Sequence, residues 1–232
     1  KAALERLKKA LDIKRATSGE KDQDIGVIIH AMAVSYTELQ KYDNAVRLFE
    51  DSVKRKKLVY GPKHLEVART LVDEGKVFEQ VGQFERALMC YEEAVDSDCY
   101  EDNSWEMGRV FMRMGITHFA LNKAEDSWDC LSEATRVFEY VERKEKKMGV
   151  YAQNARRRSK LDLHDLIKCY ECMLRLSEAS PTRYSVDRSL VLPKVAQVLS
   201  EIKEYRKAGI LYKDAIVLLK SLPGDTRFVI AT

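Results

Sequence analysis

Residues that interrupt helices are scarce in this sequence. Its 232 residues include four prolines and ten glycines, and no segment is low in complexity. Proline removes a backbone donor and glycine costs conformational entropy, so a chain poor in both can form long helices. A membrane-spanning helix needs about 18 or more consecutive apolar residues, and no such run occurs. The sequence therefore predicts a mostly helical chain with no membrane span.

The short motifs that carry common enzyme chemistry are also missing. The sequence contains no Gly-x-Gly-x-x-Gly, phosphate-binding loop, Gly-x-Ser-x-Gly or His-Glu-x-x-His. Its four histidines, His30, His64, His118 and His164, are far apart in sequence. We therefore expect no catalytic residue, no metal site and no cofactor, and we interpret the protein as a non-enzyme.

Five cysteines, an odd number, argue against a disulfide framework and favour a reducing, cytoplasmic location. Organellar targeting stays open, because the sequence begins with Lys1 and reads as a piece of a longer chain. Cys169-x-x-Cys172 resembles half of a metal or redox motif, but no second pair stands at zinc-finger spacing. We interpret these two residues as buried structural thiols and keep metal or redox chemistry as the alternative.

Charge is nearly balanced overall but unevenly distributed. The net charge is +3, and the basic residues concentrate between Arg136 and Lys160, with a smaller run at Lys54–Lys57. The first segment includes Arg156, Arg157 and Arg158. Solvated helix ends explain such runs, since cations suit a helix C-terminus. The alternatives are a docking patch for an acidic partner and an RNA- or phosphate-binding segment at 143–160, where no aromatic residues alternate with the basic ones.

A pattern of small and large side chains recurs along the chain at intervals of 42 residues. The three clearest copies are Ala3-Leu7-Ala10, Ala45-Phe49-Ser52 and Ala87-Tyr91-Ala94. The i, i+4, i+7 spacing places all three residues on one helix face. A fixed period of this length is typical of a solenoid, in which helical units stack on one another.

A second apolar helix precedes each copy of the pattern. In one copy Leu71, Gly75 and Phe78 share a face, with glycine at mid-helix. Glycine costs about 1 kcal/mol relative to alanine there, so we expect close contact with the partner helix as compensation. Near the C-terminus, Pro193 is tolerable in the first turn of a helix, which predicts a helix start near 188–189.

These residues resemble the tetratricopeptide repeat superfamily. The match is carried by Leu71, Gly75, Phe78, Ala87, Tyr91 and Ala94. The usual repeat has about 34 residues, and the longer form here resembles that of kinesin light chains. The linker supports this, because residues 60–68 are similar to that subfamily's Gly-x-x-His-Pro-x-Val-Ala, with Leu65 in place of the proline.

The resemblance implies an all-α fold, a right-handed α-solenoid of tandem antiparallel helix pairs. We expect one solenoid over residues 1–222, followed by a tail at 223–232. The expected units are a partial repeat at 1–18 and repeats at about 24–58, 66–99, 106–142, 147–180 and 188–221.

The first helix of each pair is expected to line a concave groove. The groove-facing residues are expected to be His30, Val34, Arg69, Val72, Lys76, Arg109, Met112, Ile116, Phe119 and Tyr151. We expect Met112, Ile116 and Phe119 to form an exposed apolar stripe, unless a terminal segment or a neighbouring repeat covers it. The flanking cations would suit an acidic, partly apolar peptide or helix.

The sequence thus predicts a non-catalytic interaction scaffold or adaptor that docks a peptide, a helix or a folded partner, as a subunit or fragment of a larger assembly. The alternative is a motor cargo adaptor of the kinesin light chain type. That family presents asparagines on its groove helices, whereas this chain has His30-Ala31, Val72-Asp73 and Met112-Arg113 at the equivalent places. A nucleic acid is the least favoured partner.

Overall fold

The structure is a computed structural model, and it describes residues 2–19, 22–97, 99–100, 104–147, 160–179, 185–201 and 203–221. These residues form ten helices and no strands, which confirms the predicted all-α fold. The chain divides into two compact units, Lys1–Asp102 and Asn103–Thr232. Each unit is described by itself.

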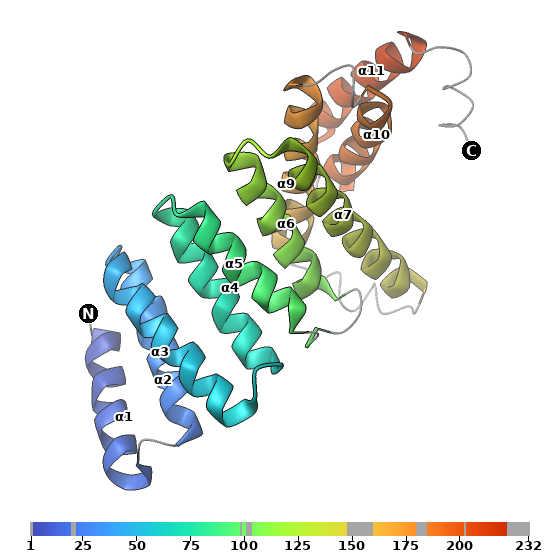
Figure 1. The fold of residues 1–232 in the computed structure, drawn as a ribbon. Coiled ribbons are helices and arrows are strands. Elements are labelled where there is room, and N and C mark those ends of the chain that lie inside the picture. The colour runs from blue at the N-terminus through green and yellow to red at the C-terminus, as the bar shows by residue number, and fades with distance from the viewer. Residues whose placement is uncertain are drawn as a thin grey trace. The chain divides into compact units, whose positions relative to one another are not determined.

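The first unit stacks helix pairs. Its helices are α1 (Ala2–Ser18), α2 (Gln23–Glu38), α3 (Tyr42–Tyr60), α4 (Leu65–Gln80) and α5 (Phe84–Asp96). α2 packs on α3 and α4 packs on α5, while α1 contacts α2 and α3 contacts α4 (Figure 1). The helix pattern of the sequence therefore becomes a layered stack within this unit.

Close packing inside each pair depends on the small residues of the repeat. Gly75 lies against Tyr91, and a Cβ atom built on Gly75 would be 2.5 Å from the Tyr91 Cε1 atom. The Tyr91 side chain is fully buried between Ala87 and Ala94, and its hydroxyl donates a hydrogen bond to Glu79 Oε1 at 2.8 Å. The expected compensation for a mid-helix glycine is therefore present.

The second unit uses the same packing between its first two helices. It contains α6 (Trp105–Ala120), α7 (Ala124–Lys147), α9 (Lys160–Ala179), α10 (Ser185–Glu201) and α11 (Tyr205–Ser221). A Cβ atom on Gly108 would lie 2.5 Å from Phe138 Cε1, and one on Gly115 would lie 2.6 Å from Leu131 Cγ. α9 packs against α6, α7 and α10, and α10 pairs with α11.

The turns inside the helix pairs share one backbone conformation. A residue with positive φ follows the first helix of each pair, with values of 57°, 75°, 57° and 68° at Gln40, Gly82, Asn122 and Lys203. The next amide then donates to a carbonyl five residues back, as from Gln83 to Phe78 at 2.9 Å. This pattern closes a helix C-terminus and satisfies its last carbonyls, so each pair reverses direction within a short turn.

The predicted start of the last pair was wrong. α10 begins at Ser185, so Pro193 lies inside the helix and not in its first turn. Proline lacks the amide hydrogen that would extend the internal hydrogen-bond ladder. Leu192, Val195 and Ala196 are buried around it, and this packing offsets the lost bond.

The basic run at 54–57 is not uniformly solvated, because Lys56 is buried between α3 and α4. Its side chain is 2% exposed, and its ammonium group donates to Glu66 Oε2 and to Thr70 Oγ1, both at 3.0 Å. The hydrogen bond from Lys56 lowers the pKa of the Glu66 carboxyl, although partial burial acts in the opposite direction. This ion pair therefore joins two successive helix pairs.

Replacing Glu66 with glutamine is expected to lower the free energy of unfolding by about 1–2 kcal/mol at pH 7, because the buried Lys56 ammonium loses its anionic partner. The carboxyl pKa is lowered in the fold, so this stabilisation exists above the ordinary pKa and disappears as the pH falls through the lowered value. Urea denaturation at pH 7 measures it. Arg69→Gln is the matched control, since Arg69 contacts the same carboxyl from solvent, and a loss as large as that of Glu66→Gln would contradict the assignment.

Candidate binding site

The structure brings two predicted groove residues of the first unit, His30 and Lys76, together around the Asp73 carboxylate. Asp73 Oδ2 lies 3.3 Å from His30 Nε2, and Asp73 Oδ1 lies 2.7 Å from Lys76 Nζ. Burial acts to raise the pKa of the Asp73 carboxyl, but the hydrogen bond from His30 and the charge of Lys76 outweigh it and lower the pKa. The Asp73 carboxylate thus links α2 to α4 and neutralises the Lys76 ammonium.

The other predicted groove residues of this unit serve mainly in packing or local pairing. Val34 and Val72 are half-buried and pack against separate parts of the core. Arg69 is exposed, and its guanidinium lies 3.2 Å from Glu66 Oε1. Val34 and Val72 therefore contribute to the core of this unit.

In the second unit, the expected exposed stripe is covered. Met112 is 5% exposed and belongs to the buried core, while Ile116 and Phe119 are half-buried against the same core. The cause is α9, which packs onto α6. The predicted exposure was wrong, and the alternative of cover by a neighbouring repeat is what occurs.

The basic groove residues already have anionic partners. In the second unit, Arg109 Nε lies 2.8 Å from Asp165 Oδ2 on α9, as Arg69 and Lys76 pair with carboxylates in the first. An acidic partner would have to compete with these pairs. Tyr151, Arg156, Arg157 and Arg158 lie outside the described residues.

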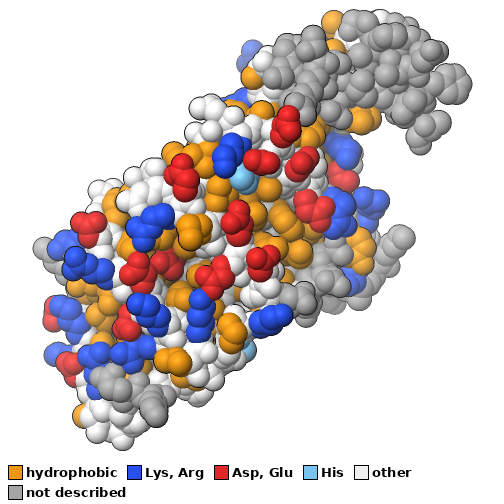
Figure 2. All heavy atoms as spheres, viewed as in Figure 1, with side chains coloured by type: hydrophobic (Ala, Val, Ile, Leu, Met, Phe, Trp, Pro, Cys, Tyr) orange, Lys and Arg blue, Asp and Glu red, His pale blue; other side chains and the backbone are white. Residues whose placement is uncertain are grey.

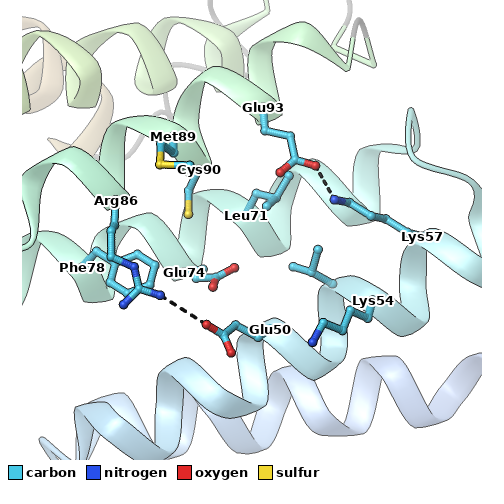
Figure 3. A pocket seen from close by; sticks show the side chains of 11 residues that line it. Glu50, Lys54, Lys57, Leu71, Glu74, Phe78, Arg86, Met89, Cys90 and Glu93 are labelled. Atoms are coloured by element: carbon cyan, nitrogen blue, oxygen red, sulfur yellow. Dashed lines mark hydrogen bonds and ion pairs between the residues drawn. The ribbon is translucent and has the colours of Figure 1, made fainter.

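The first unit contains a surface cleft that the sequence did not predict. It lies between α3 and α5, with α4 as its floor, and encloses about 300 Å³ (Figure 3). Apolar side chains from all three helices line it, namely Val53, Leu71, Phe78 and Met89. Charged and apolar side chains alternate over the face of this unit seen in Figure 2. The cleft thus combines apolar walls with charged side chains.

Two ion pairs connect α3 to α5 on opposite sides of the cleft (Figure 3). Arg86 Nη2 lies 3.3 Å from Glu50 Oε1, and the Lys57 ammonium pairs with Glu93. The Arg86 guanidinium also lies over the Phe78 ring, 4.1 Å from its centroid. These contacts hold the two walls in place and leave the space between them open.

Glu74 lies at the centre of the cleft and is only 6% exposed. Its carboxyl is directed into the hollow, and no hydrogen bond or ion pair joins it to any residue in the described ranges. Burial raises the pKa of this carboxyl to about 7, and the charges of Glu50 and Glu93 add to that effect against those of Arg86 and Lys57. The Glu74 carboxyl is therefore only partly ionised at neutral pH.

Sequence reasoning missed Glu74, although a signal was present. Leu71, Glu74 and Phe78 have i, i+3, i+7 spacing and share the buried stripe of α4. A carboxylate inside such a stripe indicates either a buried ion pair or a site that needs a charge.

The cysteines near these features are protonated thiols. Burial, with the nearby Glu74 and Glu93, raises the pKa of Cys90 beside the cleft to about 12. In α9, burial raises the pKa of Cys172 to about 11 and that of Cys169 further. Only the thiolate is a good nucleophile or metal ligand, so these values support the interpretation of both motif cysteines as structural.

Within the described parts of the chain, no three or more histidine, cysteine, aspartate or glutamate side chains gather in a way that could hold a metal ion. No helix in the same ranges has the length and apolar character needed to cross a membrane.

Comparisons with known proteins agree on the fold. Residues 24–99 match the tetratricopeptide repeat family. The putative kinesin light chain TPR-like repeats of Podosopora anserina superpose with a TM-score of 0.62 at 14% identity, covering 87% of each chain. BtubC (BKLC) from P. vanneervenii gives 0.57 at 17%, covering 60% of this chain and 56% of that one. A Rap protein complexed with Competence and Sporulation Factor gives 0.52 at 13%, covering 94% and 58%.

These structural likenesses have low sequence identity and show the fold alone. This chain spans little more than half the length of the BtubC and Rap chains, and no curated protein matches its sequence. The sequence resemblance is nevertheless confirmed: residues 24–99 match tetratricopeptide repeats, and the described helices have the fold of TPR-like repeat proteins, kinesin light chain-like structures included.

Proposed function

We propose that this chain is a non-catalytic protein-interaction module and that a partner segment docks over the α3–α5 cleft. One observation carries the proposal: an apolar hollow lies open at the surface between two ion pairs, with the unpaired Glu74 carboxyl at its floor. Apolar side chains enclosed by a polar rim are usual in protein interfaces. The partner is a protein or peptide that is partly apolar.

The size of the cleft supports docking of a side chain. A volume of about 300 Å³ is at the lower end for small-molecule sites, which cover roughly 300–1,000 Å³. Met89 adds apolar surface at the cleft and is 67% exposed. Five free thiols support a reducing compartment, and a place in a larger assembly remains part of the proposal.

Peptides selected on the immobilised protein from a random phage-displayed library test this function. We expect them to bind at least about tenfold more weakly to Met89→Ser, because the substitution removes apolar surface from the wall of the cleft. Fluorescence polarisation with synthetic peptides measures the dissociation constants. Circular dichroism confirms that the helical content of the variant is unchanged.

Leu58→Ser is the matched control. Leu58 is on α3, is 87% exposed and does not line the cleft, so binding should persist in that variant. If no peptide is enriched, or if both variants bind as well as the original protein, the docking function at this cleft is refuted.

A further inference from the structure

The Glu74 carboxyl has the environment of a group that binds a positive charge. It is more than nine-tenths buried, it is aimed into an open cleft, and it makes no hydrogen bond or ion pair with any described residue. A buried carboxylate without a partner is costly. A cation entering the cleft would supply that partner.

We propose that the α3–α5 cleft receives the cationic side chain of a partner segment, a lysine or an arginine, against the Glu74 carboxylate. The inference rests on the proposed docking function and names the chemistry of its central contact. Ionic hydrogen bonds of this kind are stronger than neutral ones, more so where water is excluded.

Charge complementarity selects a cation over an anion. The rim cations Arg86 and Lys57 are already paired with Glu50 and Glu93, and the lining of the cleft places Glu74 between those pairs. Lys54, the remaining lining cation, is exposed on α3. An anionic ligand would meet the Glu74 carboxylate, whereas a cationic ligand would meet the one carboxylate of the lining that no rim residue neutralises.

The walls of the cleft suit the rest of such a side chain. Lysine and arginine carry an apolar stem of methylene groups, which packs well on apolar surface while the charged head reaches a polar partner. Val53 and Leu71 lie on the walls and floor, and Met89 extends from α5. The cleft therefore offers apolar contacts for the stem above a carboxylate for the head.

Binding should depend on pH, because the cation competes with a proton for the same carboxylate. The charged and titratable groups facing Glu74 are Glu50, Lys54 and Lys57 from α3 and Arg86, Cys90 and Glu93 from α5. Glu74, with a pKa of about 7, changes charge between pH 5.5 and pH 8.5. Cys90, with a pKa of about 12, stays a thiol throughout. Affinity for a cation is therefore expected to rise with pH.

The test uses two tripeptides, Ac-Leu-Arg-Leu-NH2 and the same peptide with citrulline, which is nearly isosteric with arginine but neutral. The ¹³C-methyl resonance of Met89 reports binding. At pH 8.5 we expect the arginine peptide to bind at least about tenfold more tightly than the citrulline peptide. At pH 5.5 the arginine peptide should bind several-fold more weakly than it does at pH 8.5. Glu74→Gln should remove both the preference for arginine and the pH dependence. Glu92→Gln, which removes an exposed carboxylate of α5 outside the cleft lining, should keep both.

Equal binding of the two peptides, unchanged arginine binding in Glu74→Gln, or no binding of the arginine peptide overturns the cation site. These results are distinguishable from failure of the docking function. If library-selected peptides depend on Met89 but ignore Glu74, a partner docks at the cleft without a cationic anchor. If no selected peptide depends on Met89, the docking function itself is refuted.

Discussion

Replacing Tyr91 with alanine is expected to lower the free energy of unfolding by about 3–5 kcal/mol, the range for truncating a large aromatic core residue. The Tyr91 ring is fully buried and fills the space beside Gly75, and its hydroxyl donates to Glu79. Urea denaturation followed by circular dichroism measures the loss. Tyr91→Phe keeps the ring and should cost only about 1 kcal/mol. Equal losses in the two variants would show that ring packing is not the cause.

The contact between Gly75 and Tyr91 allows a second test, in which the effect of Gly75→Ala on the free energy of unfolding changes sign. Gly75→Ala should cost about 1 kcal/mol in the original protein, because overpacking against Tyr91 exceeds the gain in helix propensity. In the Tyr91→Ala background the ring is gone, so Gly75→Ala should become stabilising by a similar amount. Gly209→Ala in α11 is the control, since a Cβ atom there meets nothing within 4 Å, and it should stabilise by about 0.5–1 kcal/mol. If Gly75→Ala stabilises the original protein, the proposed close packing is refuted.

Sequence spacing predicted the fold because the repeat encodes contacts within a helix pair. Ala87, Tyr91 and Ala94 share one face, and all three are fully buried. Gly75 and Gly115 lie where large side chains from the partner helix fill the space. These contacts join residues close in sequence, so helical periodicity is enough to identify them.

Contacts between successive helix pairs could not be predicted from the sequence in the same way. Exposure of Met112 depended on whether α9 packs on α6, and that contact joins segments about 50 residues apart. Lys56 belongs to a basic run in the sequence, but its side chain is directed toward Glu66 and Thr70. Period and composition show which face of a helix is apolar, whereas the next layer of the stack determines which face is covered.

The cleft was missed for a related reason. Its walls come from α3 and α5, the second helices of two successive pairs, whereas the repeat pattern predicted binding on the first helices. Cations on those first helices then proved to be paired, as in the contacts of Lys76 with Asp73 and of Arg109 with Asp165. The sequence shows each charge but not its partner across the stack.

Replacing Glu74 with glutamine is expected to stabilise the protein by about 3 kcal/mol above pH 8. The pKa of Glu74 is raised from about 4.5 to about 7 in the fold, so between these values the folded state holds a proton that the unfolded state has lost. The stability that this proton provides is complete below pH 4.5 and is lost as the pH rises through 7, at about 1.4 kcal/mol per pH unit. Glutamine is neutral at every pH and avoids the loss.

Urea denaturation of the original protein and of Glu74→Gln across pH 4.5–8.5 measures the effect. The two stabilities should converge near pH 4.5 and separate as the pH rises, while Glu92→Gln, a change at an exposed position of α5, should shift stability by less than about 0.5 kcal/mol at any pH. Parallel pH profiles for Glu74→Gln and the original protein would mean that Glu74 has an internal partner. Separation would mean that this carboxyl weakens the fold at neutral pH. A neutral side chain at position 74 would then make the fold more stable. A carboxyl that lowers the stability is best explained by a role in binding, in which it pairs with a cation of the partner.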